Sequence, residues 1–562
     1  MAKIKLSNNK RRQLCALVDH ALALAGKGQL DIACRICARA DTLYEDFPDT
    51  MYARGLIAFN QQDIDVAADW FGRACAALPR RVEFLVNYAG CLRLQGKEEQ
   101  ASEFYRQALT RAPRLSEAAL GYGSSMVALG EFRQAIRIFE KALIHNPCNV
   151  EILKKLALVR SEMMENEASI ALLERAHTIT PQDASILYEM GVNFVQMGAI
   201  ERARSCFREV LAVNPSSAEA LSMLTNSGSC EVRKDDMAAL SKLYHQKEAG
   251  NEQRTVAAFA LGNEADRCGC YEQAFEYWAE GNRQRKTESP CTEEQQEILH
   301  RTAAAEFPAS RFEEPVAADA CDIAPLFIVG MPRSGSTLLE QALSRHPKLL
   351  AAGEMYAMQQ SIVGRKHQAS NPETIERLAA LDDDGLLAVG HEYARRLLQE
   401  YQLEGRIIDK ALNNYVYAGL IARALPKARI IHIRRNPFAT CLSIFQQDFV
   451  NTLPYACDVE HTGREYARYQ KLMQHWREVL PAGTMLEVSY EDLVNNPEPE
   501  LRRLLEGCDL EWHPDCLTSH KSAGVVTTAS LIQVRKPMHQ KSVARWKHYE
   551  KQLSPLKQYL QL

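Results

Sequence analysis

The stretch APLFIVGMPRSGSTLL, residues 324–339, decides the fold of the C-terminal part of this chain. Its apolar run predicts a short buried strand, its glycines predict a tight turn, and the residues after the turn predict the start of a helix. A turn of this kind directs several backbone N–H groups and the positive end of the helix dipole towards one point. The sequence therefore predicts an anion-binding site at this turn.

The two glycines of this turn have the spacing of a nucleoside-triphosphate P-loop, Gly330-x-x-x-x-Gly335. The next residue is Ser336, where that motif has its lysine. Arg333, inside the turn, supplies the side-chain positive charge instead. This substitution predicts a phosphate-bearing ligand other than ATP.

A second candidate anion site follows the apolar run at 428–433. Arg434 and Arg435 come at the end of this predicted strand, an Asn-Pro turn follows, and Ser443 lies on the next predicted helix. Ligands of open parallel sheets bind at the carboxyl ends of strands, and arginine can grip phosphate through two N–H groups. Taken alone, the arginine pair is equally compatible with a surface ion pair. Together with the first loop, it predicts a nucleotide that carries phosphates at two positions.

Short apolar runs alternate with helical stretches from residue 324 to the end of the chain. They lie at 325–330, 405–409, 428–434 and 484–490. This alternation is typical of an α/β domain with a parallel sheet. We therefore expect one P-loop-like α/β domain over residues 324–562.

The N-terminal part of the chain is repetitive. Prolines recur every 34 residues, at 79, 113, 147, 181 and 215, with small and large apolar residues at fixed offsets before each of them. The pattern resembles the tetratricopeptide repeat (TPR), in which small residues let two helices approach and a large residue fills the space between neighbouring pairs. It predicts five helix pairs over 48–215, an imperfect pair upstream, and a further pair at 255–282 with Ala274 and Trp278 at the small and large positions.

Repeats of this kind bury their apolar faces only by stacking on one another, so we expect a right-handed all-α solenoid with a concave face. The predicted organisation is a solenoid of about six repeats over 1–225, further TPR-like helices and a linker over 226–323, and the α/β domain over 324–562. The linker is expected at 283–323, which is polar and contains three prolines.

Composition narrows the functional class. A net charge of −4 argues against general binding of nucleic acid or anionic membranes, and no apolar run reaches the roughly 18 residues of a membrane span. The sixteen cysteines show no spacing of a disulfide framework or a zinc site, so we expect buried free thiols, no metal, and a reducing, cytoplasmic location.

The two arginine-bearing motifs together resemble those of sulfotransferases that use 3′-phosphoadenosine 5′-phosphosulfate (PAPS). Residues 325–347 resemble the 5′-phosphosulfate loop of that family, and residues 429–443 resemble its 3′-phosphate motif. The likeness is greatest to the tyrosylprotein sulfotransferases and their bacterial repeat-bearing relatives, and it spans about 324–550. It implies that the donor is bound by Arg333, Ser334, Gly335, Ser336, Thr337, Arg435, Ser443, Tyr490, Lys536 and Arg545.

The same resemblance implies three catalytic residues. Glu354 matches the catalytic base, Lys410 the lysine that stabilises the transition state, and Ser530 the serine that assists the bridging oxygen. Each has a structural alternative: Glu354 a helix-start carboxylate, Lys410 the partner of Asp409 in a surface pair, and Ser530 an ordinary loop residue. His432, inside an apolar strand, is expected to be a core residue.

The leading hypothesis is therefore a PAPS-dependent sulfotransferase that modifies a protein tyrosine bound with help from the solenoid. A glycan, a lipid or a small phenol remains an alternative acceptor. A P-loop kinase and a non-catalytic scaffold are the other classes, and Asp409 is the sole convincing magnesium ligand that a kinase would have. The solenoid is expected to bind a protein or peptide, with a spacer role or a homodimer surface as alternatives, and no nucleic acid or membrane partner is expected.

Overall fold

A computed structural model of the chain describes residues 7–226, 234–246, 250–285, 292–313, 319–363, 372–449, 453–521 and 543–560. The chain divides into two compact units, Met1–Glu162 and Met163–Leu562. Among the described helices, none combines the length and the apolar character that crossing a membrane requires. The domain boundaries expected at residues 225 and 323 do not coincide with this division and stay predictions.

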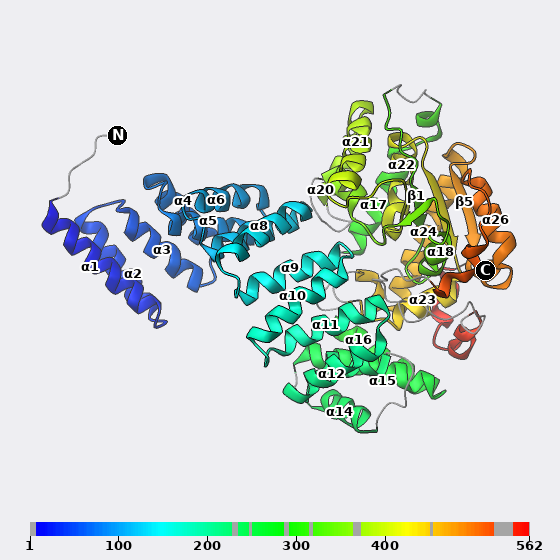
Figure 1. Ribbon diagram of the computed structural model, residues 1–562, viewed down its shortest axis with the longest axis horizontal. Coiled ribbons are helices and arrows are strands. Elements are labelled where there is room, and N and C mark those ends of the chain that lie inside the picture. The colour runs from blue at the N-terminus through cyan, green and yellow to red at the C-terminus, as the bar shows by residue number, and fades with distance from the viewer. Residues whose placement is uncertain are drawn as a thin grey trace. The chain divides into compact units, whose positions relative to one another are not determined.

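The first unit consists of antiparallel helix pairs, and α3 and α4 show the arrangement (Figure 1). Its helices are α1 Asn8–Ala25, α2 Leu30–Leu43, α3 Pro48–Asn60, α4 Ile64–Ala77, α5 Val82–Leu94, α6 Glu98–Arg111, α7 Ser116–Ala128, α8 Phe132–His145 and α9 Val150–Glu162. The predicted upstream pair is present as α1 and α2.

The close approach of paired helices depends on a glycine opposite an aromatic ring. A Cβ atom at Gly123 would lie 2.3 Å from the Phe139 ring, which is closer than side-chain packing allows. The same relation recurs between Gly55 and Phe71 and between Gly191 and Phe207. The predicted small and large positions of the repeat are therefore confirmed.

The second unit opens with more helices of the same kind. They are α10 Asn166–Ile179, α11 Ala184–Met197, α12 Ile200–Val213, α13 Ala218–Asn226, α14 Lys234–His245, α15 Asn251–Arg267 and α16 Tyr271–Arg285. The predicted further pair is α15 and α16: Ala274 and Trp278 are fully buried, and a Cβ atom at Gly262 would lie 2.5 Å from the Trp278 ring.

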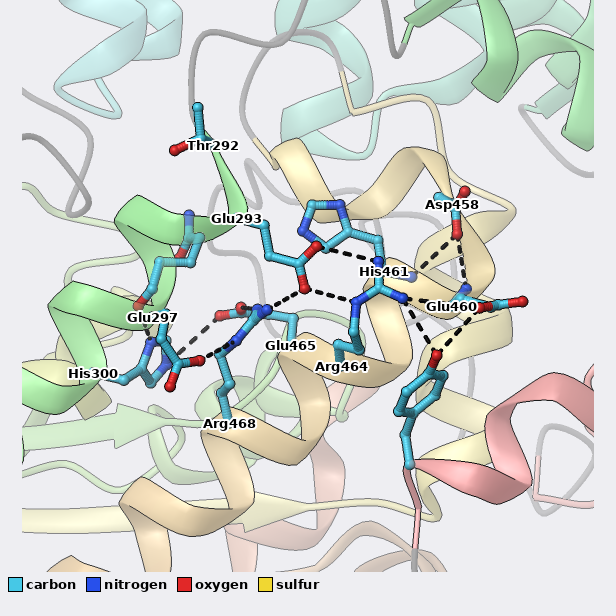
Figure 2. Close-up of polar contacts among 12 residues, drawn as sticks. Thr292, Glu293, Glu297, His300, Asp458, Glu460, His461, Arg464, Glu465 and Arg468 are labelled. Carbon is cyan, nitrogen blue, oxygen red and sulfur yellow. Dashed lines mark hydrogen bonds and ion pairs between the residues drawn. The ribbon is translucent and has the colours of Figure 1, made fainter.

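The prediction of a linker over 283–323 is wrong for residues 293–306, which form helix α17, Glu293–Glu306. Its polar residues bind α24, Val459–Val479 (Figure 2). The Arg464 Nε atom lies 2.6 Å from a Glu293 carboxylate oxygen, and the Arg468 Nε atom lies 2.9 Å from Glu297. These partners are 171 residues apart in the chain, so local polarity could not distinguish this helix from a linker.

A five-stranded parallel sheet forms the centre of the C-terminal part. Its strands are β1 Leu326–Val329, β2 Leu349–Ala351, β3 Arg406–Asp409, β4 Arg429–Arg434 and β5 Met485–Ser489, in the order β2-β3-β1-β4-β5. Four of these strands lie in the predicted apolar runs. The three-residue strand β2 was not predicted, because it is too short to show a pattern.

Successive residues of β1 point into two different cores, one on each face of the sheet. Leu326 and Ile328 pack with α18 Ser336–Leu343, α25 Tyr490–Asn495 and α26 Pro497–Gly507. Phe327 and Val329 pack with α19 Ala357–Val363, α21 Asp383–Gln399, α22 Ala418–Ala424, α23 Pro437–Phe445 and α24. Shorter elements complete this part: α20 Pro372–Ala379 and the 3-10 helices η2 Ala309–Phe312, η3 Leu412–Tyr417, η4 Pro454–Cys457, η5 Pro514–Lys521, η6 Arg545–Tyr549 and η7 Ser554–Gln558.

The last repeat pair is joined to the α/β domain by buried polar contacts. The Asn282 side chain of α16 donates a hydrogen bond of 2.8 Å to the backbone carbonyl of Phe445, at the end of α23. Arg285, which is buried, lies between two carboxylates, 2.8 Å from Asp448 and 2.5 Å from Glu252. This pair of helices is therefore fixed to α23, the helix that carries Ser443.

We expect Arg285→Met to destabilise the second unit by about 3 kcal/mol. The value is at the lower end of the range for broken buried ion pairs, because Glu252 is half exposed and regains water. Arg283→Met is the matched control on the same helix: Arg283 is exposed, and surface pairs such as the one that it forms with Glu280 contribute about 0–1 kcal/mol. Urea unfolding followed by tryptophan fluorescence would measure both, and equal midpoints would contradict the structural role of Arg285.

Candidate active site

Four neighbouring strands end at one edge of the sheet. Because β3, β1, β4 and β5 are adjacent and parallel, the residues that follow them lie at the same edge. Lys410 follows β3, the glycine-bearing loop follows β1, Arg435 follows β4 and Tyr490 follows β5. Residues predicted from separate motifs are thus brought together by the strand order.

The loop after β1 is closely packed, and its two glycines cannot be replaced without displacement of neighbouring atoms. Gly330 and Gly335 have φ angles of 153° and 102°. A Cβ atom at Gly330 would lie 2.4 Å from the backbone oxygen of Ile433, and one at Gly335 would lie 2.3 Å from the Tyr490 ring. The loop therefore touches the ends of both β4 and β5.

The same loop has the features of an anion-binding turn. Gly335 is the N-cap of α18 and has no side chain with which to cap the helix, so the helix N-terminus is suited to an external anion. Ser336 and Thr337 on the first turn are buried. The buried Ser334 hydroxyl makes no hydrogen bond to any described residue, and such a group costs free energy unless a ligand or water satisfies it.

The two arginine-bearing motifs touch each other. Arg435 donates a hydrogen bond of 3.1 Å to the backbone oxygen of Arg333, although the two residues are 102 positions apart. The Arg333 Nε atom in turn donates a 3.1 Å hydrogen bond to the hydroxyl of Ser443, which belongs to the same motif as Arg435. The Arg435 guanidinium lies 4.7 Å from the centre of the Tyr490 ring. The sequence motifs for two anion sites therefore form one continuous surface.

This surface is electrostatically unfavourable by itself. Burial, together with the positive charges of Arg435 and Arg545, lowers the pKa of Arg333 to about 10. Burial likewise lowers the pKa of Arg435. Positive charges that are partly removed from water and placed side by side are stabilised by an anion, so the arrangement favours a multiply charged anionic ligand.

Arg545 approaches the same arginines from the C-terminal end of the chain. Its Nε atom donates a 3.2 Å hydrogen bond to Asp266, and the Tyr549 hydroxyl donates to the same carboxylate. Asp266 belongs to α15, so the last repeat pair supplies the counter-ion of Arg545, the residue that is predicted to bind a phosphate. Nothing in the sequence indicated Asp266, because its partner lies 279 residues away.

A separate cluster of charges lies at the end of β3. The Lys410 Nζ atom lies 2.8 Å from a Glu354 oxygen and 3.8 Å from a Glu340 oxygen. The Lys410 and Glu340 side chains are 1% and 4% exposed, whereas Glu354 is 50% exposed. Glu354 and Lys410, predicted to act together, are thus in contact, and the alternative of a surface pair between Lys410 and Asp409 is wrong.

The charged groups of this cluster shift one another's pKa values. Burial alone would lower the pKa of Lys410, but Glu340, Glu354 and Asp409 more than offset it, and the pKa is raised. Burial raises the pKa of Glu340, although Lys410 opposes the shift. Burial also raises the pKa of Asp409 to about 7.

Glu340 was missed at the sequence level. It lies on α18, all eight residues of which are buried. A charged residue among Leu338, Leu339 and Ala342 is unusual unless it has a partner, and this was the signal that could have identified it.

The remaining predicted candidates have different outcomes. His432 is buried, and its ring nitrogens contact Glu487, at 2.8 Å, and the Tyr469 hydroxyl, which confirms the prediction of a core residue. Ser530 and Lys536 lie outside the described residues, so their predicted roles stay predictions.

The comparisons with known proteins agree with this geometry. Residues 325–514 match the model of the sulfotransferase family. The predicted resemblance is thereby confirmed. Residues 60–142 match a second model, that of subunit 3 of the anaphase-promoting complex, or cyclosome. The predicted fold class, a helical TPR-like region followed by a parallel-sheet sulfotransferase domain, is also confirmed.

Several curated proteins are similar to this chain. An uncharacterised protein of Aquifex aeolicus (strain VF5) is 28% identical over 423 residues, which are 73% of this chain and 54% of that protein. The protein-tyrosine sulfotransferase of Drosophila melanogaster is 23% identical over 242 residues, 39% of this chain and 46% of that protein. The nodulation protein NoeE of Sinorhizobium fredii is 27% identical over 213 residues, 33% of this chain and 51% of that protein. The chain thus spans about half the length of these relatives.

We expect Lys410→Met to make stability strongly pH-dependent. Without the lysine, the buried Glu340 carboxylate has no cationic partner at 3.8 Å, and a broken buried pair costs about 3 kcal/mol or more. The pKa of Glu340 is already raised on folding, so its contribution to stability is lost as pH rises above the unfolded value of about 4.3. The variant should therefore lose more stability than wild type between pH 5 and pH 8.

Thermal unfolding at both pH values would measure this difference. Lys427→Met is the matched control, because Lys427 is an exposed lysine paired with the exposed Asp322. Parallel pH profiles for Lys410→Met and the wild type would show that Glu340 and Lys410 are not coupled.

Proposed function

We propose that this chain transfers a sulfuryl group from PAPS to an acceptor hydroxyl. The observation that carries the proposal is the contact of the Arg333 loop with Arg435 and Ser443, which joins two anion-binding motifs at one edge of the sheet. A donor with phosphates at both its 5′ and 3′ positions fits such a surface better than a nucleotide with a single phosphate chain.

In this proposal each motif holds one end of the donor. The backbone N–H groups of residues 334–337 bind the 5′-phosphosulfate at the N-terminus of α18, and Arg333 adds positive charge. Arg435 and Ser443 bind the 3′-phosphate, and Tyr490 lies near the adenosine. Arg545 would exchange Asp266 for a phosphate or contact both, and Lys536 would contribute from outside the described residues.

The transfer breaks the bond between sulfur and the bridging phosphate oxygen and forms a bond between sulfur and the acceptor oxygen. The acceptor proton passes to Glu354 and then to water, and adenosine 3′,5′-bisphosphate leaves. By analogy with phosphoryl transfer, the reaction passes through a loose, in-line transition state. Lys410 neutralises charge that develops on the leaving oxygen, a role that contributes about 3–4 kcal/mol per well-placed group. The predicted help from Ser530 belongs to the same step.

A protein tyrosine is the acceptor that we propose. A phenol, with a pKa of about 10, needs a base at neutral pH, and the half-exposed Glu354 can be reached from solvent. The similarity to the protein-tyrosine sulfotransferase of Drosophila melanogaster supports this acceptor, and helical repeats commonly bind peptides. Incubation with labelled donor and host lysate, followed by mass spectrometry, would distinguish modified tyrosines from modified glycans, lipids or small phenols.

The kinase alternative is disfavoured by Asp409. One of its oxygens accepts hydrogen bonds from the Ala411 N–H at 2.9 Å and from Asn414 at 3.3 Å, and the other accepts one from Tyr393 at 3.0 Å. This carboxylate is fully buried and already bound by protein donors. A Mg²⁺ ligand must instead offer an oxygen to the ion.

We expect adenosine 3′,5′-bisphosphate to stabilise the protein, by about 2.7 kcal/mol at 100 times its Kd, whereas ATP with magnesium has little effect. Arg435→Ala should weaken bisphosphate binding about 10- to 100-fold, because hydrogen bonds to charged groups contribute about 1.5–3 kcal/mol. Arg434→Ala is the matched control, because Arg434 precedes Arg435 but is exposed. The bisphosphate affinity of this variant should stay within about twofold of the wild-type affinity. Calorimetric titration would measure both variants, and stabilisation by ATP with magnesium alone would exclude the proposed donor.

Glu354→Gln should retain bisphosphate affinity and lose turnover about 10²- to 10⁴-fold, because the amide cannot accept the acceptor proton. Turnover would be measured with labelled donor and tyrosine-containing peptides. Wild-type turnover in this variant would remove Glu354 from the role of general base.

A further inference from the structure

Glu340 lies between Glu354, the proposed base for the acceptor, and Lys410, the residue proposed to act on the leaving oxygen. One of its oxygens accepts a 3.0 Å hydrogen bond from the Gly353 N–H, directly before Glu354. The other lies 3.8 Å from the Lys410 Nζ atom. A single carboxylate of α18 therefore contacts both the segment that carries the proposed base and the proposed electrostatic residue.

The backbone around this carboxylate is already ordered by the sheet. Ala352 donates to the Ile408 carbonyl at 3.0 Å, and Lys410 donates to the Gly353 carbonyl at 2.9 Å, so the hydrogen bonds between β2 and β3 continue beyond the strands. The positive φ angle of Gly353, 67°, is part of this path. Because the segment is already held by main-chain bonds, the presence of a buried carboxylate beside Lys410 requires a separate explanation.

That explanation lies in the charge balance of the reaction. Glu340, Glu354 and Lys410 together carry one net negative charge when both carboxylates are ionised and the lysine is protonated; the Asp409 carboxylate is bound separately by Ala411, Asn414 and Tyr393. When Glu354 takes up the acceptor proton, the net charge becomes zero. Without Glu340, the same step would leave a buried, unpaired ammonium group at Lys410, at the sheet edge that also carries Arg333 and Arg435. A buried charge without a partner is costly and tends to lose its proton.

We propose that Glu340 is a positioning residue that acts through Lys410, as the counter-ion that keeps this lysine protonated and in place while Glu354 changes its charge. The inference rests on the proposed sulfuryl transfer and adds to it a residue that touches neither donor nor acceptor.

The direction of the pH effect follows from the groups that act on Lys410. These are Glu340 of α18, Glu354 of the loop before α19, and Asp409, the last residue of β3. All three carboxylates raise the pKa of Lys410. Removal of the Glu340 charge therefore lowers that pKa, and activity that needs the protonated lysine is lost at a lower pH than in the wild type.

The main test is Glu340→Gln, which keeps the side-chain volume and an oxygen that accepts the Gly353 N–H. We expect kcat to fall at least tenfold, the acceptor KM and the bisphosphate Kd to stay within about twofold, and the alkaline limb of the kcat profile to move to lower pH. Glu465→Gln is the control for loss of a buried carboxylate, because Glu465 is fully buried on α24 and pairs with Arg468. Glu465→Gln should leave the alkaline limb in place. If Glu340→Gln leaves both this limb and kcat unchanged, the proposal is overturned.

A double-mutant cycle tests whether Glu340 acts through Lys410. In a Lys410→Ala background, Glu340→Gln should have little further effect on kcat, because the residue that it serves is gone. If Glu340→Gln lowers kcat as much in this background as it does in the wild type, Glu340 acts by another route. If Glu340→Gln does not fold, Glu340→Asp decides the question: the retained charge should keep the alkaline limb near its wild-type position, and a limb shifted to lower pH would contradict the proposal.

A second measurement needs no turnover. NMR of the protein with isotope-labelled lysine side chains follows the protonation of each lysine across a pH series and needs no reagent to reach the buried Lys410. Glu340→Gln should shift the signal change of Lys410 to lower pH, with the signal of the exposed Lys427 as the reference. If no acceptor is ever sulfated but this shift occurs, the proposed function fails and the link between Glu340 and Lys410 stands. If sulfation occurs and neither the Lys410 signal nor the pH limb responds, the inference fails.

Discussion

The contact between Arg333 and Arg435 is the constraint on which the sulfotransferase domain is organised. Two like charges, partly removed from water, are held together by a hydrogen bond from one guanidinium to the other residue's backbone. Gly330 packs against β4 and Gly335 against Tyr490, so closely that neither position has room for a Cβ atom. Folding thus imposes an electrostatic cost at this surface, and the proposed binding of an anionic donor would lower it.

The helical repeats affect the charges around Arg333, in addition to any binding surface that they form by themselves. Asp266 of α15 binds Arg545, whose charge acts on Arg333. Asn282 and Arg285 of α16 anchor the same helix pair to the end of α23 and to Asp448. The last repeat pair therefore contacts residues of the proposed donor site in the second unit. Removal of this pair would leave Arg545 without Asp266, and the end of α23 without the hydrogen bond from Asn282.

Much of the architecture was predictable because it depends on local spacing. The helix pairs follow from glycines and aromatic rings at fixed offsets, and the contact between Gly123 and Phe139 shows why the offsets are fixed. The glycine-bearing turn and the strand before Arg435 were likewise predictable from short runs of residues. By contrast, α17 was mistaken for a linker, because its polar face is explained only by Arg464 and Arg468 of a distant helix.

By itself, the sequence determined the repeat helices, four of the five strands, and the residue types of two anion-binding motifs, since each of these depends on neighbours within a few turns of chain. Only the tertiary structure decided that the motifs share one surface, that Glu340 lies beside Lys410 and that Asp266 binds Arg545. These contacts join residues 70 to 279 positions apart. They arise from the order of the strands and the packing of helices on them, which no local pattern of residues specifies.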